Sequence, residues 1–230
     1  MTTLELRLYE DKLPALPPGV VPANATPVSL PRERRIVYVR EGSLTLSHPT
    51  GGRSIMEDDA WVGSAALALV GGPAGARVYR WELSNPAAPA GLLPTGASGL
   101  ESRLLLAHAV ELDPKVGWLL RCDRVEFPKS GIAYTHVHQG PGIRCCVKGE
   151  LRVDSEGKSH SYGPGQPWFE RGPDPVIAFA SDRAETAFVR GFVLPRAVKG
   201  RSSIRYVLPE DQEKPKPQKY RVYGEEFVDI

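Results

Sequence analysis

The sequence predicts an all-β protein built from two copies of one barrel or sandwich unit. The 23 glycines and 22 prolines among 230 residues interrupt helices at short intervals and favour turns. Most apolar segments are short, rich in β-branched and aromatic residues, and bounded by turn residues, as in strands. A repeat of matching residues also relates the two halves of the chain. Many short strands at regular spacing are typical of β-sandwiches and β-barrels.

The predicted strands follow one another with turns such as Ser155-Glu156-Gly157 and Gly163-Pro164-Gly165 between them. Residues 99–112 have the best helical spacing of leucines, so a short helix and a strand both remain open there. The predicted strands span residues 36–39, 44–46, 76–83, 118–127, 143–147, 151–153, 176–179 and 187–194.

The repeat is carried by a few residues at nearly constant spacing. Gly42 and Gly149 lie 107 residues apart, as do Trp61 and Trp168, and residues 78–80 match residues 188–190 at a spacing of 110. We therefore predict an N-terminal unit over residues 1–95 and a C-terminal unit over residues 96–205. The Ala/Pro/Gly-rich residues 87–99 form the predicted linker. Residues 206–230 form a predicted extended arm, of which residues 220–230 are apolar enough to dock on a domain or on a neighbouring subunit.

Composition excludes several classes of partner. Lys and Arg total 29 against 27 Asp and Glu, a net charge of +2, which predicts no affinity for nucleic acids. No apolar run approaches the roughly 20 residues of a membrane span, and the first ten residues lack the layout of a signal peptide. Cys122, Cys145 and Cys146 form no disulfide framework. We expect a cytoplasmic protein.

Two histidines, His136 and His138, are separated by one residue. Alternate residues of a strand point to the same face, so the two imidazoles can converge on one metal ion. A solvated strand face carrying two polar residues would give the same pattern, and the pair alone does not separate these interpretations.

The surroundings of the pair resemble the first motif of the cupin superfamily, with Gly131 before the histidines and Gly149 eleven residues after His138. Residues 157–165 resemble the opening of the second motif. With the repeat, the whole chain resembles a bicupin, which implies two jelly-roll barrels. The stretch from residue 136 to 193 is also similar to bacterial cupin-domain proteins for which no reaction is defined.

The resemblance implies four metal ligands, of which two are replaced here. Gly142 stands where the family has a metal-binding Glu, and the second-motif His falls near Pro175. Glu170 is the best replacement, because an inward carboxylate there would complete a 2-His-1-carboxylate set for Fe, Mn, Ni or Zn. A surface Glu170 paired with a neighbouring Arg is the alternative. Gln139 is expected to help bind the substrate if the Gly140-Pro141-Gly142 bend rotates it inward; alternation alone places it on the opposite face, and its amide oxygen is a weaker donor than a carboxylate.

Arg144 is predicted to share the inward face with the histidines. A buried guanidinium needs an anionic partner, which is either Glu170 or a carboxylate or phosphate of a bound small molecule. Tyr134, two residues before His136, is expected on the same face at the mouth of the barrel. Cys146 also faces inward, where a free cysteine is usually a small apolar residue.

The N-terminal copy has no counterpart of the histidine pair. At the 107-residue spacing, Ser29 and Pro31 correspond to His136 and His138, and Arg35 to Gly142. This half is expected to be a scaffold. Three functions stay open for the chain: a metal-dependent dioxygenase, isomerase or hydrolase acting on a small organic acid, a metal-free protein binding a small anion, and a structural bicupin. The resemblance and the tail also indicate a homodimer.

Overall fold

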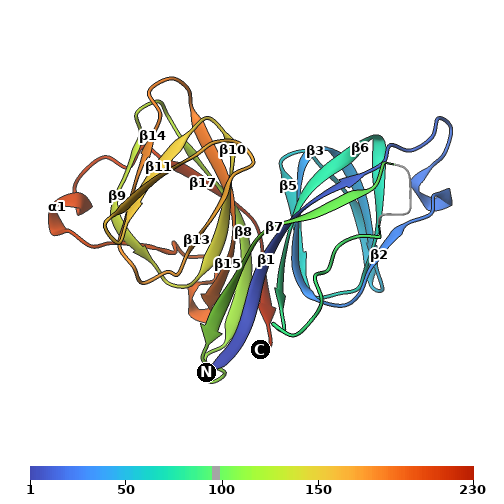
Figure 1. The fold of residues 1–230 in the computed structure, drawn as a ribbon, viewed down its shortest axis with the longest axis horizontal. Helices are drawn as coiled ribbons and strands as arrows, with labels where there is room; N and C mark the ends of the chain where they lie inside the picture. The colour runs from blue at the N-terminus through green and yellow to red at the C-terminus, as the bar shows by residue number, and fades with distance from the viewer. Residues whose placement is uncertain (95–98) are drawn as a thin grey trace. The chain divides into compact units, whose positions relative to one another are not determined.

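The computed structural model describes residues 1–94 and 99–230 and consists almost entirely of antiparallel strands. The chain divides into two units, Met1–Leu112 and Asp113–Ile230, each with an apolar core of its own (Figure 1). Within the described ranges, the helices are all too short and too polar to cross a membrane. The all-β class predicted from the sequence is confirmed.

The N-terminal unit is one highly bent sheet with the order β4-β3-β6-β1-β7, in which β2 also pairs with β6 and β5 with β3. The long strands β3 and β6 change register near their middles, which lets the sheet curl around the core. Its elements are β1 (Thr2–Leu13), η1 (Pro22–Asn24), β2 (Val28–Leu30), β3 (Arg34–His48), β4 (Gly51–Met56), β5 (Asp59–Gly63), β6 (Leu67–Ser84) and β7 (Glu101–Leu112).

The C-terminal unit is a sandwich of two five-stranded sheets, β13-β10-β15-β8-β17 and β12-β11-β14-β9-β16. Apolar side chains from both sheets fill the space between them. Its elements are β8 (Trp118–Phe127), β9 (Ile132–His138), β10 (Gly142–Lys148), β11 (Leu151–Ser155), β12 (Lys158–Tyr162), β13 (Pro167–Glu170), β14 (Val176–Ala180), β15 (Thr186–Pro195), η2 (Arg196–Val198), β16 (Ile204–Tyr206), α1 (Pro209–Gln212) and β17 (Lys219–Val228).

Strand pairing confirms the internal repeat. Val37 pairs with Trp61 in the N-terminal unit, and Arg144 pairs with Trp168 in the C-terminal unit, both shifted by the predicted 107 residues. The matched glycines Gly42 and Gly149 have positive φ angles of 79° and 69°. A Cβ at Gly42 would collide with the Gly75 carbonyl oxygen, and one at Gly149 with the Glu185 carbonyl oxygen. The glycine repeats because the same bend recurs in both units.

The unit boundaries differ from those predicted. The expected boundary between residues 95 and 96 lies outside the described residues, but residues 101–112 form a strand that pairs with β1, so they belong to the N-terminal unit. The leucines at helical spacing are therefore in a strand. Residues 206–230 are not an extended arm, because β17 pairs with β8 along nearly its whole length.

Candidate functional site

The two histidines of β9 lie inside the C-terminal barrel. His136 and His138 are 5% and 4% exposed, and their ring centroids are 4.8 Å apart with the rings nearly perpendicular. Strand β9 lies between β14 and β16 in its sheet. On the β16 side, Tyr206 is the strand partner of His136, and Ile204 is the strand partner of His138. The burial of both rings excludes the solvated strand face.

Glu170, at the end of β13, joins the histidines in the interior. Its Oε2 lies 3.3 Å from His138 Nε2 and 2.8 Å from Arg144 Nη2. Its Oε1 accepts a hydrogen bond of 2.8 Å from Trp168 Nε1. The structure thus brings Glu170 to the predicted metal ligands rather than to the surface. It also forms the ion pair with Arg144 that the sequence left open as one of two partners for that guanidinium.

Several polar atoms of this cluster have unused hydrogen-bonding capacity. His136 Nδ1 lies 2.7 Å from the Tyr134 carbonyl oxygen, so Nδ1 carries the proton and Nε2 keeps its lone pair. Neither His138 Nδ1 nor Glu170 Oε2 has a hydrogen-bond partner among the described residues. Arg144 Nη2 is at ion-pair distance from Oε2, but the angles do not make a hydrogen bond. Such buried orphans are rare in proteins unless a ligand or ion satisfies them.

Arg144 is held on several sides by the barrel itself. Its Nη1 donates to the carbonyl oxygens of Gly142 and Glu170, and the guanidinium lies over the Phe192 ring at 4.6 Å. The Arg190 guanidinium lies at the same distance from that ring and forms an ion pair with Asp123. Burial lowers the pKa of Arg144 to about 10, so it stays a cation at neutral pH.

The electrostatics favour two neutral imidazoles beside one carboxylate. Burial lowers the pKa of His136 and lowers that of His138 further, against the opposing effect of Glu170. Burial disfavours the charged form of Glu170, but Arg144, His138 and Trp168 outweigh it and hold the pKa of Glu170 well below its usual range. Neutral imidazole and ionised carboxylate are the forms that bind metal ions.

The cavity enclosed by these side chains is small, with a volume of about 20 Å³. A cavity needs roughly 10–15 Å³ to hold one water molecule, so this one accepts a single ion or water. Within the described ranges, no three His, Cys, Asp or Glu side chains are grouped as a formed metal site. Metal binding by His136, His138 and Glu170 therefore requires a rearrangement of their side chains.

Two predicted site residues lie elsewhere. Tyr134 and Gln139 are absent from the lining of the cavity, whereas Ala133 lines it together with the histidines. The pairing of β9 with β14 shifts register between Ala133 and His136, which marks a β-bulge. The bulge breaks the alternation on which the position of Tyr134 was predicted. Gln139 instead donates to the Ser202 carbonyl oxygen at 3.3 Å.

Cys146 is a core residue. It is fully buried in the apolar cluster between the sheets and does not line the cavity. Burial raises the pKa of its thiol to about 11, so the thiolate that a nucleophile or metal ligand needs is disfavoured.

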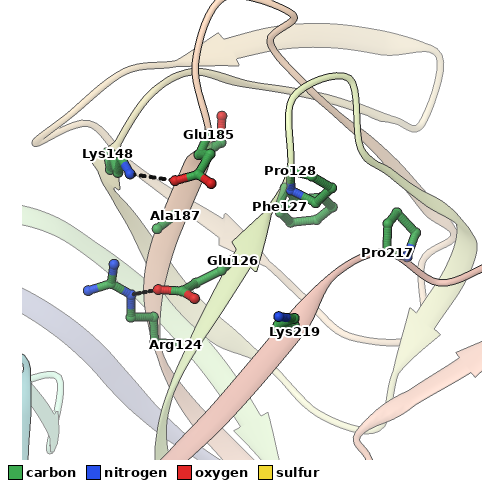
Figure 2. A pocket seen from close by; sticks show the side chains of 10 residues that line it. Arg124, Glu126, Phe127, Pro128, Lys148, Glu185, Ala187, Pro217 and Lys219 are labelled. Atoms are coloured by element: carbon green, nitrogen blue, oxygen red, sulfur yellow. Dashed lines mark hydrogen bonds and ion pairs between the residues drawn. The ribbon is translucent and has the colours of Figure 1, made fainter.

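A larger hollow of about 370 Å³ lies elsewhere in the C-terminal unit, around Phe127 and Pro217. Figure 2 shows its charged side chains turned toward one another, with Lys148 at 2.8 Å from Glu185 and Arg124 at 3.0 Å from Glu126. Neither histidine of β9 lines it, so it is a separate surface feature.

The N-terminal barrel lacks all four polar groups of this cluster. At the 107-residue spacing, Ser29, Pro31, Val37 and Gly63 replace His136, His138, Arg144 and Glu170. Its buried charges sit elsewhere and pair among themselves: Glu82 Oε1 lies 2.7 Å from both Arg35 Nη2 and Arg80 Nη1, and Arg80 Nε lies 2.6 Å from Asp11 Oδ2. The barrel fold therefore does not itself require the histidine cluster.

Sequence reasoning missed the residues that surround the cluster. Asp123, Arg190 and Phe192 line or support the site from β8 and β15, and Trp168 donates to Glu170 as well as packing in the core. A signal for Arg190 existed, because it matches Arg80 in the repeat and both arginines pair with an aspartate of a neighbouring strand.

Comparison with known proteins gives matches in structure only. No family model matches the sequence, and no curated protein does either. A variant of oxalate decarboxylase from Bacillus subtilis is 10% identical, with a TM-score of 0.59 over 94% of this chain and 79% of that one. A variant of salicylate 1,2-dioxygenase from Pseudoaminobacter salicylatoxidans is 12% identical, with a TM-score of 0.52 over 86% and 73% of the two chains.

A third similar structure is AerE from Microcystis aeruginosa, at 14% identity and a TM-score of 0.54 over 74% of this chain and 83% of that one. At these identities the similarity establishes the fold and leaves the activity open. The chain therefore has the predicted fold of two cupin-like jelly-roll barrels in one polypeptide.

Proposed function

We propose that the C-terminal barrel binds a divalent metal ion through His136, His138 and Glu170, in an enzyme that acts on a small organic acid. The observation that carries the proposal is the convergence of two neutral imidazoles and one carboxylate on a cavity the size of an ion. Two imidazoles and one carboxylate form a facial donor set used for iron, and imidazole also suits zinc, nickel and copper.

The contact between His138 and Glu170 favours a cation between them. If the His138 proton is on Nδ1, then Nε2 and Glu170 Oε2 face each other with lone pairs at 3.3 Å. Donor atoms at about 2.0–2.2 Å from one ion and at angles of about 90–110° lie about 2.8–3.6 Å apart. The orphaned Glu170 Oε2 fits this arrangement, because a cation would supply the partner that this oxygen lacks.

In this proposal the chain's own residues prepare the donors. The Tyr134 carbonyl holds the His136 proton on Nδ1 and so directs the Nε2 lone pair away from the backbone. Arg144 and Trp168 keep Glu170 ionised and oriented. A bound ion would supply Lewis-acid activation of water, dioxygen or a substrate carboxylate. The oxalate decarboxylase and salicylate dioxygenase with the same fold are named for small organic acids, which supports that substrate class.

One observation favours a second function, a metal-free protein that binds a small anion. Arg144 lies 2.8 Å from Glu170 Oε2, so a cation already neutralises the carboxylate that the metal needs. In that case Arg144, Arg190 and the single N–H of His138 act as the hydrogen-bond donors around an anion.

Metal titration separates the two functions. Chelator-treated protein without an affinity tag is titrated with Mn²⁺, Fe²⁺, Ni²⁺ and Zn²⁺ by calorimetry. We expect one equivalent of at least one metal to bind, and His136→Ala or His138→Ala to weaken that binding at least tenfold. The matched control is His160→Ala, because His160 is exposed on β12. Equal affinity in all these variants, or no binding by the wild type, would exclude the metal site.

A further inference from the structure

Strand β17 is the edge of its sheet, and its outer side has no strand partner among the described residues. It runs for ten residues, Lys219–Val228, without a proline, and the large apolar side chains of Tyr220, Val222 and Phe227 on it are exposed. The other edge strands of the C-terminal unit, β12, β13 and β16, are only three to five residues long. A long edge strand with exposed apolar side chains is a place where another strand can add to the sheet.

A β-bulge in the middle of β17 decides which of its side chains share a face. The register with β8 shifts within residues 222–224, which reverses the alternation of side chains beyond that point. Tyr220 pairs with Val125 and Phe227 with Leu119, and these two buried residues of β8 lie an even number of positions apart. Tyr220 and Phe227 therefore lie on one face of the sheet, although the spacing between them is odd.

Two exposed side chains of opposite charge share the other face of β17. Arg221 pairs with Arg124 of β8 and Glu226 with Leu120, which again lie an even number of positions apart. The neighbouring Glu225 points to the first face, where it forms an ion pair with the buried Arg121. Each face of β17 thus carries one matched pair at its two ends, aromatic on one face and charged on the other.

This pattern is complementary to itself in an antiparallel arrangement. A register that places Tyr220 opposite Phe227 of a second copy also places Arg221 opposite Glu226 of that copy. The two-fold symmetry of such a pair repeats both contacts, giving two aromatic and two oppositely charged cross-strand pairs. Pairs of both kinds stabilise antiparallel strands when the side chains lie on the same face, as the bulge ensures here.

The long edge strand of the N-terminal unit, β7, does not present its charges in this way. Its Glu101 lies 2.7 Å from Lys12, and its Arg103 lies 2.9 Å from Glu10. Both partners belong to β1, the neighbouring strand of the same sheet, so these charges are already paired within the unit. The charge complementarity therefore favours β17 as the edge that meets a second copy.

We infer that this protein forms a homodimer in which β17 pairs antiparallel with β17 of a second copy. The sheet β13-β10-β15-β8-β17 then continues across the two-fold axis into the same sheet of the partner. The bulge interrupts the new ladder at its centre, and residues 219–222 pair with residues 225–228 on either side of it. The inference is independent of the proposed metal site.

Charge reversal in the full-length protein tests the interface, with the dimer dissociation constant measured by analytical ultracentrifugation. Arg221→Glu and Glu226→Arg should each weaken dimerisation at least tenfold, because each variant places two pairs of like charge across the axis. The double variant restores opposite charges and should return to within about threefold of the wild type. Lys158→Glu, an equal charge change at an exposed residue of β12, is the control and should leave the dimer unchanged.

Cysteine cross-linking tests the register. A mixture of Arg221→Cys and Glu226→Cys should form a disulfide-linked dimer under mild oxidation, whereas each variant alone should not. The native cysteines are buried and do not compete. A monomeric wild type, a dimer that neither charge reversal weakens, or cross-linking of position 221 to any strand other than β17 of the second copy would overturn the inference.

Discussion

Glu170 is the residue on which the site depends. It contacts a guanidinium, an imidazole and an indole N–H, three groups that stabilise its ionised form. Because it lies beside Arg144, it serves either as half of an internal ion pair or as a metal ligand that shares its oxygen with that arginine. Breaking a buried ion pair from one side costs about 3–5 kcal/mol, since the remaining charge is left without a partner.

A double-mutant cycle tests this pair. Glu170→Gln and Arg144→Met should each lower the free energy of unfolding by about 3 kcal/mol, and the double variant should lose much less than the sum of the two. Urea unfolding of metal-free protein measures these values. Additive losses would show that the 2.8 Å contact contributes nothing to stability.

At the scale of elements, β16 closes the site from the side of β9. Strand β16 pairs with His136 and His138 of β9. One residue after β16 ends, the Val207 N–H donates a hydrogen bond of 3.0 Å to the Thr135 carbonyl oxygen. Helix α1 follows directly and lies next to β16. This pairing consists of three residue pairs only, so we expect it to open more readily than the longer ladders of the unit.

Val207→Pro removes that donor and should separate β16 from β9, while Val207→Ala keeps the N–H and serves as the control. Diethyl pyrocarbonate modifies accessible neutral imidazoles, and mass spectrometry locates the adducts. We expect His136 and His138 to be protected in the wild type and in Val207→Ala, and to react at least tenfold faster in Val207→Pro. The same rate in both variants would mean that β16 does not control access.

The sequence predicted the strands, the repeat and two histidines on one face of a strand, because alternation and turn residues are local signals, and the resemblance to cupins implied that this face is the inner one. Tyr134 was misplaced since a β-bulge leaves no mark in a single strand's pattern. The domain boundary and the role of residues 206–230 depend on pairing with β1 and β8, which lie far away in the chain. The sequence leaves two partners for Arg144, the Glu170 carboxylate and an anionic group of a bound small molecule. No pattern in the sequence distinguishes an anion supplied by the protein from one supplied by a ligand.

At the scale of the whole molecule, one fold is used in two ways. The N-terminal barrel pairs its buried charges internally, and Arg80 and Arg7 also bind carbonyl oxygens of the segment from Ala88 to Gly91. Among the described residues, Arg80 Nη1 is the buried side-chain polar atom of the N-terminal unit that makes no hydrogen bond, whereas the C-terminal unit has several, including His138 Nδ1 and Glu170 Oε2 beside the small cavity. This contrast supports the predicted roles of scaffold and site.

The two units should respond differently to acid. His136 and His138 are buried with lowered pKa values, whereas His48 and His108 in the N-terminal unit are not buried. Unfolded imidazoles gain protons below about pH 6.5 while the folded ones stay neutral, so stability is lost as pH falls. Glu170 adds a further loss, which begins only below about pH 4.3.

Hydrogen exchange of metal-free protein at pH 7 and pH 5, corrected for intrinsic rates, checks this prediction. The amide protection factors of β9 and β14 should fall about tenfold for each unit by which the pKa of the two histidines lies below its value in the unfolded chain. The fall is limited by the difference between that unfolded pKa and pH 5. Protection of β3 and β6 should stay the same. Equal losses in both units would show that the buried imidazoles are not the cause.

The most direct measurement is the anomalous scattering of crystals grown with Mn²⁺ or Zn²⁺. A metal site formed by His136, His138 and Glu170 predicts one strong peak at about 2.0–2.2 Å from an imidazole nitrogen of each histidine and from a Glu170 oxygen. Glu170 would be turned toward the peak, with Arg144 at its far side. Crystals that show no peak between these three residues at millimolar metal would contradict the account.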